Sequence, residues 1–196
     1  MYRVTIDPGH GGKDRANVGP TGYVEADGVL KIALLLEAEL KKTGAFKVQM
    51  TRRTDKYLTL TARGKMAVKN KSDLFISEHT NASNGKASGA EAFYSVDLPN
   101  DKVFAAKLST AVAQALGIPD RGAKTRPSPA NPREDYYTVI DTAQDGGVPH
   151  VLLVESAFHD NPKDEKLLKD DEMLAKIAKA QAGVICEQFG VAAGSK

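Results

Sequence analysis

Short apolar segments alternate with longer amphipathic segments along this chain of 196 residues, and this alternation limits the fold more than any other feature. The apolar runs at 74–76 and 151–154 are typical of buried strands. Other apolar residues recur at helical spacing, as do Val29, Ile32 and Leu36. Because such alternation is typical of α/β proteins, we expect a mostly parallel sheet covered by helices on both faces.

The expected elements follow from the same patterns and from the Gly and Pro residues between them. The expected strands are 2–6, 46–50, 73–77, 90–96, 137–140 and 148–154. The expected helices are one that starts near Glu25 and ends before Gly44, then 60–68, 101–116 and 174–189. Segments 81–89 and 124–134 are expected to be loops. We find no internal repeat or shift in composition, so we expect one domain over 1–190, with 191–196 as a tail or the start of a linker.

Charge and cysteine content exclude several classes of protein. The chain has 27 Lys and Arg against 25 Asp and Glu, for a formal net charge of +2. This near balance argues against a nucleic-acid partner. Cys186 is the only cysteine, so neither an internal disulfide nor a multi-cysteine zinc cluster is expected. Any metal must therefore be held by carboxylates and by some of the four histidines.

Four chemically reactive side chains are predicted to meet at one edge of the sheet. His10, His79 and Glu155 each follow an apolar strand, and Glu25 begins the helix after the first strand. The carboxyl ends of parallel strands are where open α/β sheets bind ligands. Two histidines and one carboxylate form the ligand set of a hydrolytic zinc site, with the fourth position left for water. We therefore expect His10, Glu25 and His79 to bind one Zn²⁺, which activates water for hydrolysis.

Glu155 is then the candidate general base, because the end of a strand holds it rigidly. Asn81 is a candidate for orienting a histidine or binding substrate, and His159, four residues after Glu155, is a candidate to line the pocket. His150 precedes the last strand, at the opposite edge, and is expected to be an exposed loop residue.

Each of these residues also has a simpler interpretation. A single histidine after a strand is more often a loop residue, and a glutamate at a helix start is favoured by the helix dipole alone. The glycines at 9–12 are also compatible with a turn or a weak phosphate loop, although they lack the Lys-Ser/Thr of a P-loop. The expected convergence of several groups favours the metal site.

Four separated motifs stand out along the chain: Asp-Pro-Gly-His-Gly-Gly at 7–12, Glu25 ahead of its helix, Ser-Glu-His-Thr-Asn-Ala at 77–82 and Val-Glu-Ser-Ala-Phe-His-Asp-Asn at 154–161. Together they resemble the zinc-dependent N-acetylmuramoyl-L-alanine amidases of the amidase_3 type. Arg-Gly-Ala-Lys at 121–124 and the segment 137–140 resemble intervening blocks of that family. The match runs in order through nearly the whole chain. Departures at Glu78, Thr80, His159 and Asp160 affect neither the ligands nor Glu155.

The resemblance implies a three-layer α/β catalytic domain with a six-stranded sheet. It implies one zinc ion on His10, Glu25 and His79, with Glu155 catalytic. The implied reaction is hydrolysis of the amide between the lactyl group of N-acetylmuramic acid and L-alanine in bacterial peptidoglycan. The short chain most resembles phage endolysins, which often carry a separate C-terminal wall-binding domain.

Neither a secretory leader nor an apolar run long enough for a membrane helix is visible. We therefore expect no membrane insertion, synthesis in the cytoplasm, and action on the wall after lysis or export. Two alternative functions remain: another zinc hydrolase of peptidoglycan, such as a stem-peptide peptidase or a deacetylase, and a non-catalytic wall-binding module. The module would be marked by loss of a ligand or of Glu155, and the sequence retains all four residues.

Overall fold

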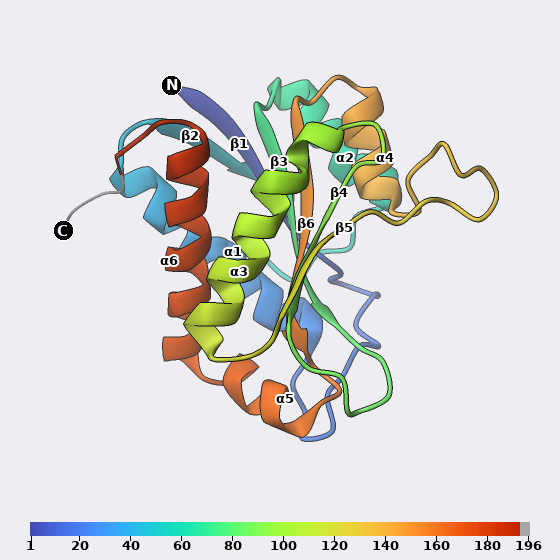
Figure 1. Cartoon of the computed structure of the whole chain (residues 1–196), viewed down its shortest axis with the longest axis vertical. Coiled ribbons are helices and arrows are strands. Elements are labelled where there is room, and N and C mark those ends of the chain that lie inside the picture. Colours follow the sequence, from blue (N-terminus) through green and yellow to red (C-terminus); the bar gives the residue numbers. More distant parts are fainter. Residues whose placement is uncertain (193–196) are drawn as a thin grey trace.

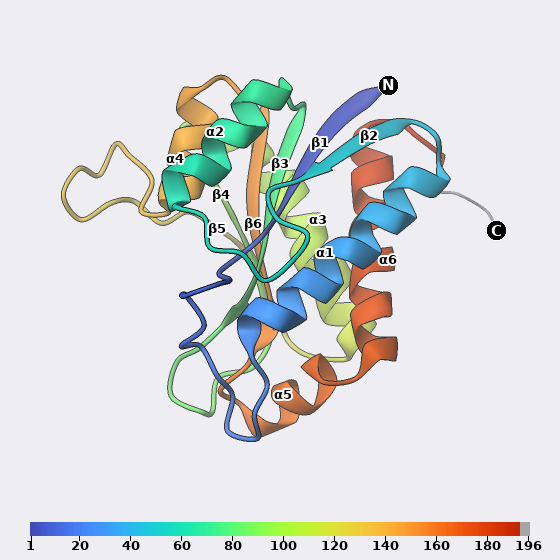
Figure 2. The same cartoon turned by 180° about the vertical axis from the view of Figure 1, so that it is seen from behind.

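A computed structural model describes residues 1–192 as a six-stranded sheet with helices on both sides (Figures 1 and 2). The strands are β1 (Tyr2–Pro8), β2 (Phe46–Met50), β3 (Leu74–Asn81), β4 (Ala90–Tyr94), β5 (Asp120–Lys124) and β6 (His150–Phe158). The helices are α1 (Glu25–Lys42), α2 (Leu60–Asn70), α3 (Lys102–Leu116), α4 (Thr138–Asp145), α5 (Pro162–Leu168) and α6 (Asp171–Gln188), with a 3-10 turn at Pro99–Asp101. The expected α/β class is confirmed.

The strand order is β2-β1-β3-β6-β4-β5, and β4 runs antiparallel to β6 while the other neighbouring pairs are parallel. β1, β3 and β6 thus lie side by side in the middle of the sheet and point the same way. Their carboxyl ends meet at one edge, where His10, His79 and Glu155 were expected.

Apolar residues alternate between the two faces of the sheet and form two cores. The larger core joins the sheet to α1, α3 and α6, and includes Leu36, Ile76 and Ile177. The smaller core joins the opposite face to α2 and α4, and includes Phe75 and Ile140. Figure 1 shows the sheet nearly edge-on between these two groups of helices, which confirms the three-layer arrangement.

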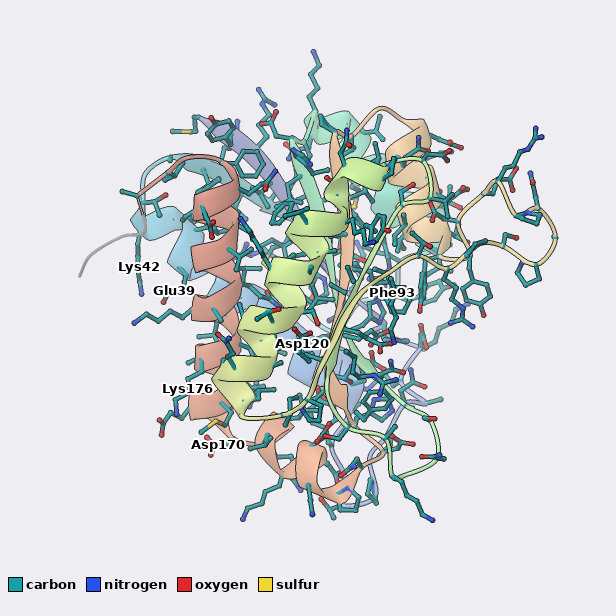
Figure 3. The ribbon with its side chains drawn as sticks, viewed as in Figure 1. Glu39, Lys42, Phe93, Asp120, Asp170 and Lys176 are labelled. Atoms are coloured by element: carbon teal, nitrogen blue, oxygen red, sulfur yellow. The ribbon has the colours of Figure 1, made fainter. Side chains whose placement is uncertain are left out.

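Side chains at the element ends help to fix these boundaries. Asp170 lies at the base of α6 (Figure 3) and its carboxylate accepts hydrogen bonds from the backbone N–H groups of Glu172 and Met173. Asp120, at the start of β5, accepts hydrogen bonds from Ser109 and Thr110 of α3. These are the contacts by which acidic residues cap helices and anchor edge strands.

The strand predicted at 137–140 is wrong, because residues 138–140 form the first turn of helix α4 and Tyr137 is its N-cap. Val139, Ile140 and Ala143 lie on one side of α4 and pack into the smaller core, a periodicity that a four-residue window does not reveal. The sixth strand is instead β5, which has no buried residue and therefore lacks the apolar pattern of a strand. α5 was also not predicted, although Asn161 caps it and Pro162 is its first residue.

Several boundaries differ from the expected ones. β3 and β6 extend to Asn81 and Phe158, so His79 and Glu155 lie inside strands and not after them. His150 begins β6, is half-buried and hydrogen-bonds Asp101 at 2.6 Å, so it is not an exposed loop residue. The expected tail, 191–196, lies mostly outside the described residues. Within 1–192, no helix is both long and apolar enough to span a membrane.

Candidate metal centre and catalytic site

His10, Glu25 and His79 come together at the carboxyl edge of the sheet. One ligand atom from each lies within 4.8 Å of the other two. The two carboxylate oxygens of Glu25 face different rings: Oε2 is 3.3 Å from His10 Nε2, and Oε1 is 3.1 Å from His79 Nδ1. The convergence expected from the strand ends is therefore present in the structure.

The glycine before His10 is required by the close approach of the second histidine. A Cβ atom on Gly9 would lie 2.2 Å from Cε1 of the His79 ring, too near for any side chain. His10 itself has a φ of 59°, in the left-handed region that is uncommon for residues other than glycine. This backbone conformation turns the His10 ring toward Glu25, and such strain is often found at functional sites.

Two buried arginines hold this strained loop. Arg63 donates hydrogen bonds to the backbone oxygens of Pro8 (2.7 Å) and His10 (2.6 Å), and Arg52 donates to those of Pro8 (2.9 Å) and Gly9 (2.6 Å). Arg63 also pairs with the buried carboxylate of Asp7 at 2.9 Å. Neither arginine was predicted, because sequence patterns treat an arginine in a helix or loop as a surface residue.

Glu25 is set up as an ionised ligand. Burial alone would raise its pKa, but hydrogen bonds from His10 and His79 outweigh burial and hold the pKa well below its ordinary value. The backbone N–H of Thr80 and the side-chain amide of Asn17 also donate to its oxygens, at 2.9 and 2.8 Å. Glu25 therefore carries a negative charge in a nearly closed site.

His10 has a second acidic neighbour. Its Nδ1 lies 3.0 Å from Oδ2 of Asp14, so Asp14 orients the ring while Nε2 faces Glu25. Burial lowers the pKa of His10, but Glu25 and Asp14 raise it by more, and the net pKa is above its ordinary value. Asp14 and Asn17 were not singled out by the sequence, since the loop that carries them has no regular pattern.

Glu155 differs from Glu25 because one of its oxygens is left without a partner. It is directly opposite His79 in the β3–β6 register, and its buried Oε2 has no hydrogen-bond partner among residues 1–192. Burial raises its pKa well above the ordinary value, and the charges of Glu25 and Glu91 raise it further, whereas Arg126 lowers it. A buried carboxyl oxygen without a partner costs free energy, and a catalytic role is one reason for a protein to retain it.

Glu91 lies opposite Glu155 in the β4–β6 register, and its carboxylate has several partners. It accepts hydrogen bonds from Asn81 at 2.9 Å, Arg121 at 2.6 Å and Lys124 at 2.5 Å. These bonds occupy its oxygens, so Glu91 is poorly suited to exchange protons and Glu155 is the free acid of the pair. The side-chain amide of Asn81, expected to orient a histidine or bind substrate, donates its hydrogen bond to Glu91 instead.

His159 is buried close to Glu25. It is only 4 % exposed, and its Nδ1 hydrogen-bonds Thr80 Oγ1 at 3.0 Å and lies 3.9 Å from Oε2 of Glu25. A cavity of about 200 Å³ lies beside His10 and His79. Its walls include His10, His79, Leu60, Tyr136, Tyr137, Val139 and Leu153. His159 and Asn81 are not among the residues that line it.

Taken together, the fold and the site define a class: an α/β domain with two histidines, a carboxylate and a second, unpartnered acid is built like a metal-dependent hydrolase. Comparison with known proteins gives the family. Residues 4–187 match Amidase_3, described as N-acetylmuramoyl-L-alanine amidase, and the chain belongs to this family.

Individual relatives agree with this family. N-acetylmuramoyl-L-alanine amidase LytC of Bacillus subtilis is 33% identical over 180 residues, which are 90% of this chain and 33% of LytC. The solved catalytic domain of CwlV, an N-acetylmuramoyl-L-alanine amidase from Bacillus (Paenibacillus) polymyxa, is 31% identical with a TM-score of 0.83, and 98% of this chain covers 100% of that domain. Cwp6 from Clostridium difficile is 32% identical with a TM-score of 0.86, over 95% of this chain and 29% of Cwp6. The chain thus spans about a third of the length of LytC and of Cwp6.

Proposed function

We propose that this chain hydrolyses the amide bond between N-acetylmuramic acid and L-alanine in peptidoglycan, with one zinc ion held by His10, Glu25 and His79. Membership of the amidase family supports the substrate. The observation that carries the chemistry is the unpartnered, buried Oε2 of Glu155 beside the His-Glu-His cluster.

The donor set fits zinc. Two imidazole nitrogens and one carboxylate oxygen are ligands that Zn²⁺ prefers at catalytic sites. The cluster is compact, and the low pKa of Glu25 means that its carboxylate is already deprotonated. When bound, zinc would supply Lewis-acid chemistry, polarising the lactyl carbonyl and making water more acidic.

The protein's own groups then have distinct tasks. Oε2 of Glu155 accepts a proton from the attacking water and afterwards donates it to the departing alanine nitrogen. Glu25 stays ionised throughout, while Asp14 and Thr80 keep His10 and Glu25 in their orientations.

Purified peptidoglycan provides the test. Wild type loaded with zinc is expected to release peptides with free L-alanine amino groups and to create no new reducing sugar ends, as shown by mass spectrometry. Glu155→Gln should keep its zinc by elemental analysis and lose at least about a hundredfold in kcat. His79→Ala should lose zinc as well as activity. Glu187→Gln, at an exposed ion pair with Lys107, serves as the control and should match wild type.

Other products would contradict the proposal. Cleavage within the stem peptide would indicate a peptidase, and release of acetate would indicate a deacetylase. Full activity of Glu155→Gln would remove Glu155 from the mechanism. Action on the wall after lysis or export, an endolysin-like role and a separate wall-binding domain are part of the same proposal. They are supported by the resemblance of the sequence motifs and by the greater length of LytC.

A further inference from the structure

The loop between β5 and α4 forms one wall of the catalytic cavity and carries an organised positive charge. Figure 1 shows this loop projecting from the body of the domain. Its base is fixed: Asp135 accepts hydrogen bonds from Ser95 Oγ (2.6 Å) and the Val96 N–H (3.0 Å), and Pro127 and Asp135 form a backbone bridge. The residues at the base therefore have defined positions relative to the sheet.

Arg126 lies at this base, against two tyrosines. Its guanidinium carbon is 3.7 Å from the centre of the Tyr136 ring and 5.5 Å from that of Tyr137. Nη1 donates a hydrogen bond to the Tyr137 hydroxyl at 3.3 Å, and the Arg126 carbonyl accepts one from the Tyr136 N–H at 2.8 Å. Aromatic stacking holds the planar group in one orientation, which lowers the entropy lost when it binds a ligand.

The charge of Arg126 is not neutralised by the described part of the protein. A guanidinium has five N–H donors, and within residues 1–192 the side chain of Arg126 makes the single hydrogen bond to Tyr137, with no acidic group in ion-pair contact. The neighbouring cations differ: Arg121 and Lys124 both pair with Glu91. Arg126 is thus an exposed, preorganised donor set for an anion.

Its position relates this donor set to the substrate. The rings of Tyr136 and Tyr137 line the same cavity as His10 and His79, so the guanidinium stacked on them lies next to one wall of that cavity. Arg126 is also among the charges that act on Glu155, which places it within electrostatic range of that carboxyl group. An anionic group of a substrate seated in this cavity would therefore lie near Arg126.

The anionic group nearest the scissile amide is the candidate for this ligand. On the glycan side of the scissile amide, the lactyl carboxyl is consumed in the bond and the sugars are neutral. On the peptide side, the residue after L-alanine is a glutamate whose α-carboxyl group is either free or amidated. One residue spans about 3.5 Å of extended chain, so this carboxyl group lies one to two residues from the scissile bond.

Resting on the function proposed above, we propose that Arg126, held by Tyr136 and Tyr137, binds the α-carboxylate of the glutamate that follows L-alanine. The loop between β5 and α4 thereby selects stem peptides with a free carboxylate over amidated ones. Arg126 is a specificity-determining residue and takes no part in the proton transfers.

The test combines two substrates with four proteins. Soluble muropeptides with the same glycan and stem peptide are prepared in a glutamate form and an isoglutamine form, which differ only in that carboxyl group. Wild type, Arg126→Gln, Arg126→Lys and the control Arg133→Gln are assayed on both for lactyl–alanine cleavage. Arg133 is exposed on the same loop, but among residues 1–192 it is Arg126, and not Arg133, that stacks on Tyr136 and Tyr137.

We expect the kcat/KM of wild type to be roughly fivefold higher for the glutamate form than for the isoglutamine form, because an ion pair open to solvent contributes little free energy. Arg126→Gln should bring the ratio close to one, chiefly through a higher KM for the glutamate form. Arg126→Lys should keep part of the preference, and Arg133→Gln all of it. Raising the salt concentration should reduce the preference of wild type.

A merely structural role for Arg126 gives a different result, because a distorted loop would slow both substrates equally and leave their ratio unchanged. That outcome, or equal kcat/KM for the two forms in wild type, overturns this inference while leaving the proposed function intact. Failure of wild type to cleave the lactyl–alanine bond of either form overturns the proposed function, and this inference with it.

Discussion

Replacing Arg63 with methionine should destabilise the protein strongly and disturb the metal site. Arg63 is 2 % exposed, and its partner Asp7 is fully buried. Methionine keeps much of the bulk but removes the charge and the bonds to the backbone of Pro8 and His10. Thr51 and Ser77 would still donate to Asp7, but neither compensates its charge. Breaking a buried ion pair from one side costs about 3–5 kcal/mol.

The free energy of unfolding is measured by urea denaturation with a chelator present, so that metal binding does not add to the stability. For a domain of this size, each kcal/mol lowers Tm by about 2–4 °C, so we expect Arg63→Met to lower Tm by roughly 10 °C or more. Arg53→Met is the matched control. Arg53 is exposed and pairs with the buried Glu37, which keeps Lys41 as a second partner, so the loss of Arg53 should cost clearly less than the loss of Arg63.

The variant also tests whether the loop positions its histidine. Without the bond from Arg63 to the His10 carbonyl, the left-handed backbone at His10 loses support. At a temperature where both proteins are folded, Arg63→Met should bind zinc more weakly than Arg53→Met in competition with a coloured chelator. If Arg63→Met lost no more stability than Arg53→Met, and bound zinc equally well, the reasoning about this buried pair would be refuted.

Two further predictions concern the glycine under His79 and a buried acid on the other face of β3. Gly9→Ala should fold but bind zinc at least about tenfold more weakly, because its Cβ would displace the His79 ring. The control Gly183→Ala, which has open space around it, should bind zinc normally. Both are measured by the same competition with a coloured chelator. Burial raises the pKa of Glu78 from 4.5 to about 7 in the folded protein. The folded state therefore binds the proton more tightly than the unfolded state, and the free energy of unfolding is highest below pH 4.5 and falls as the pH rises through 7. In chelator, Glu78→Gln should therefore melt above wild type at pH 8.5, with a gap that narrows toward pH 5; a gap independent of pH would contradict this.

The sequence predicted those parts of the fold that depend on apolar periodicity. β1, β2, the helix that begins at Glu25, and α6 all bury a regular apolar face, and the structure contains them close to the expected bounds. β5 could not be predicted in this way because it is a polar edge strand whose residues are held by Asp120 and by pairing with β4. The segment 137–140 was misassigned because its four residues fit both periodicities.

The ligands of the candidate site were predictable because strand order in an α/β sheet makes strand ends converge, so the positions of His10 and His79 follow from topology. The residues that support them were not. Arg52 and Arg63 reach the site through side-chain contacts across the fold, which no pattern in the sequence records. Asp14 and Asn17 lie close to His10 in the sequence, but in a loop without a regular pattern.

The comparison of Glu155 with Glu91 shows what the structure adds to the assignment of roles. Both are buried glutamates directly opposite each other on neighbouring strands. A sequence motif cannot say which of two such acids is free to exchange a proton, because that depends on the partners each one has. Asn81, Arg121 and Lys124 occupy the oxygens of Glu91, whereas the buried Oε2 of Glu155 has no hydrogen-bond partner among residues 1–192. This difference in partners is how two chemically identical side chains can take different roles.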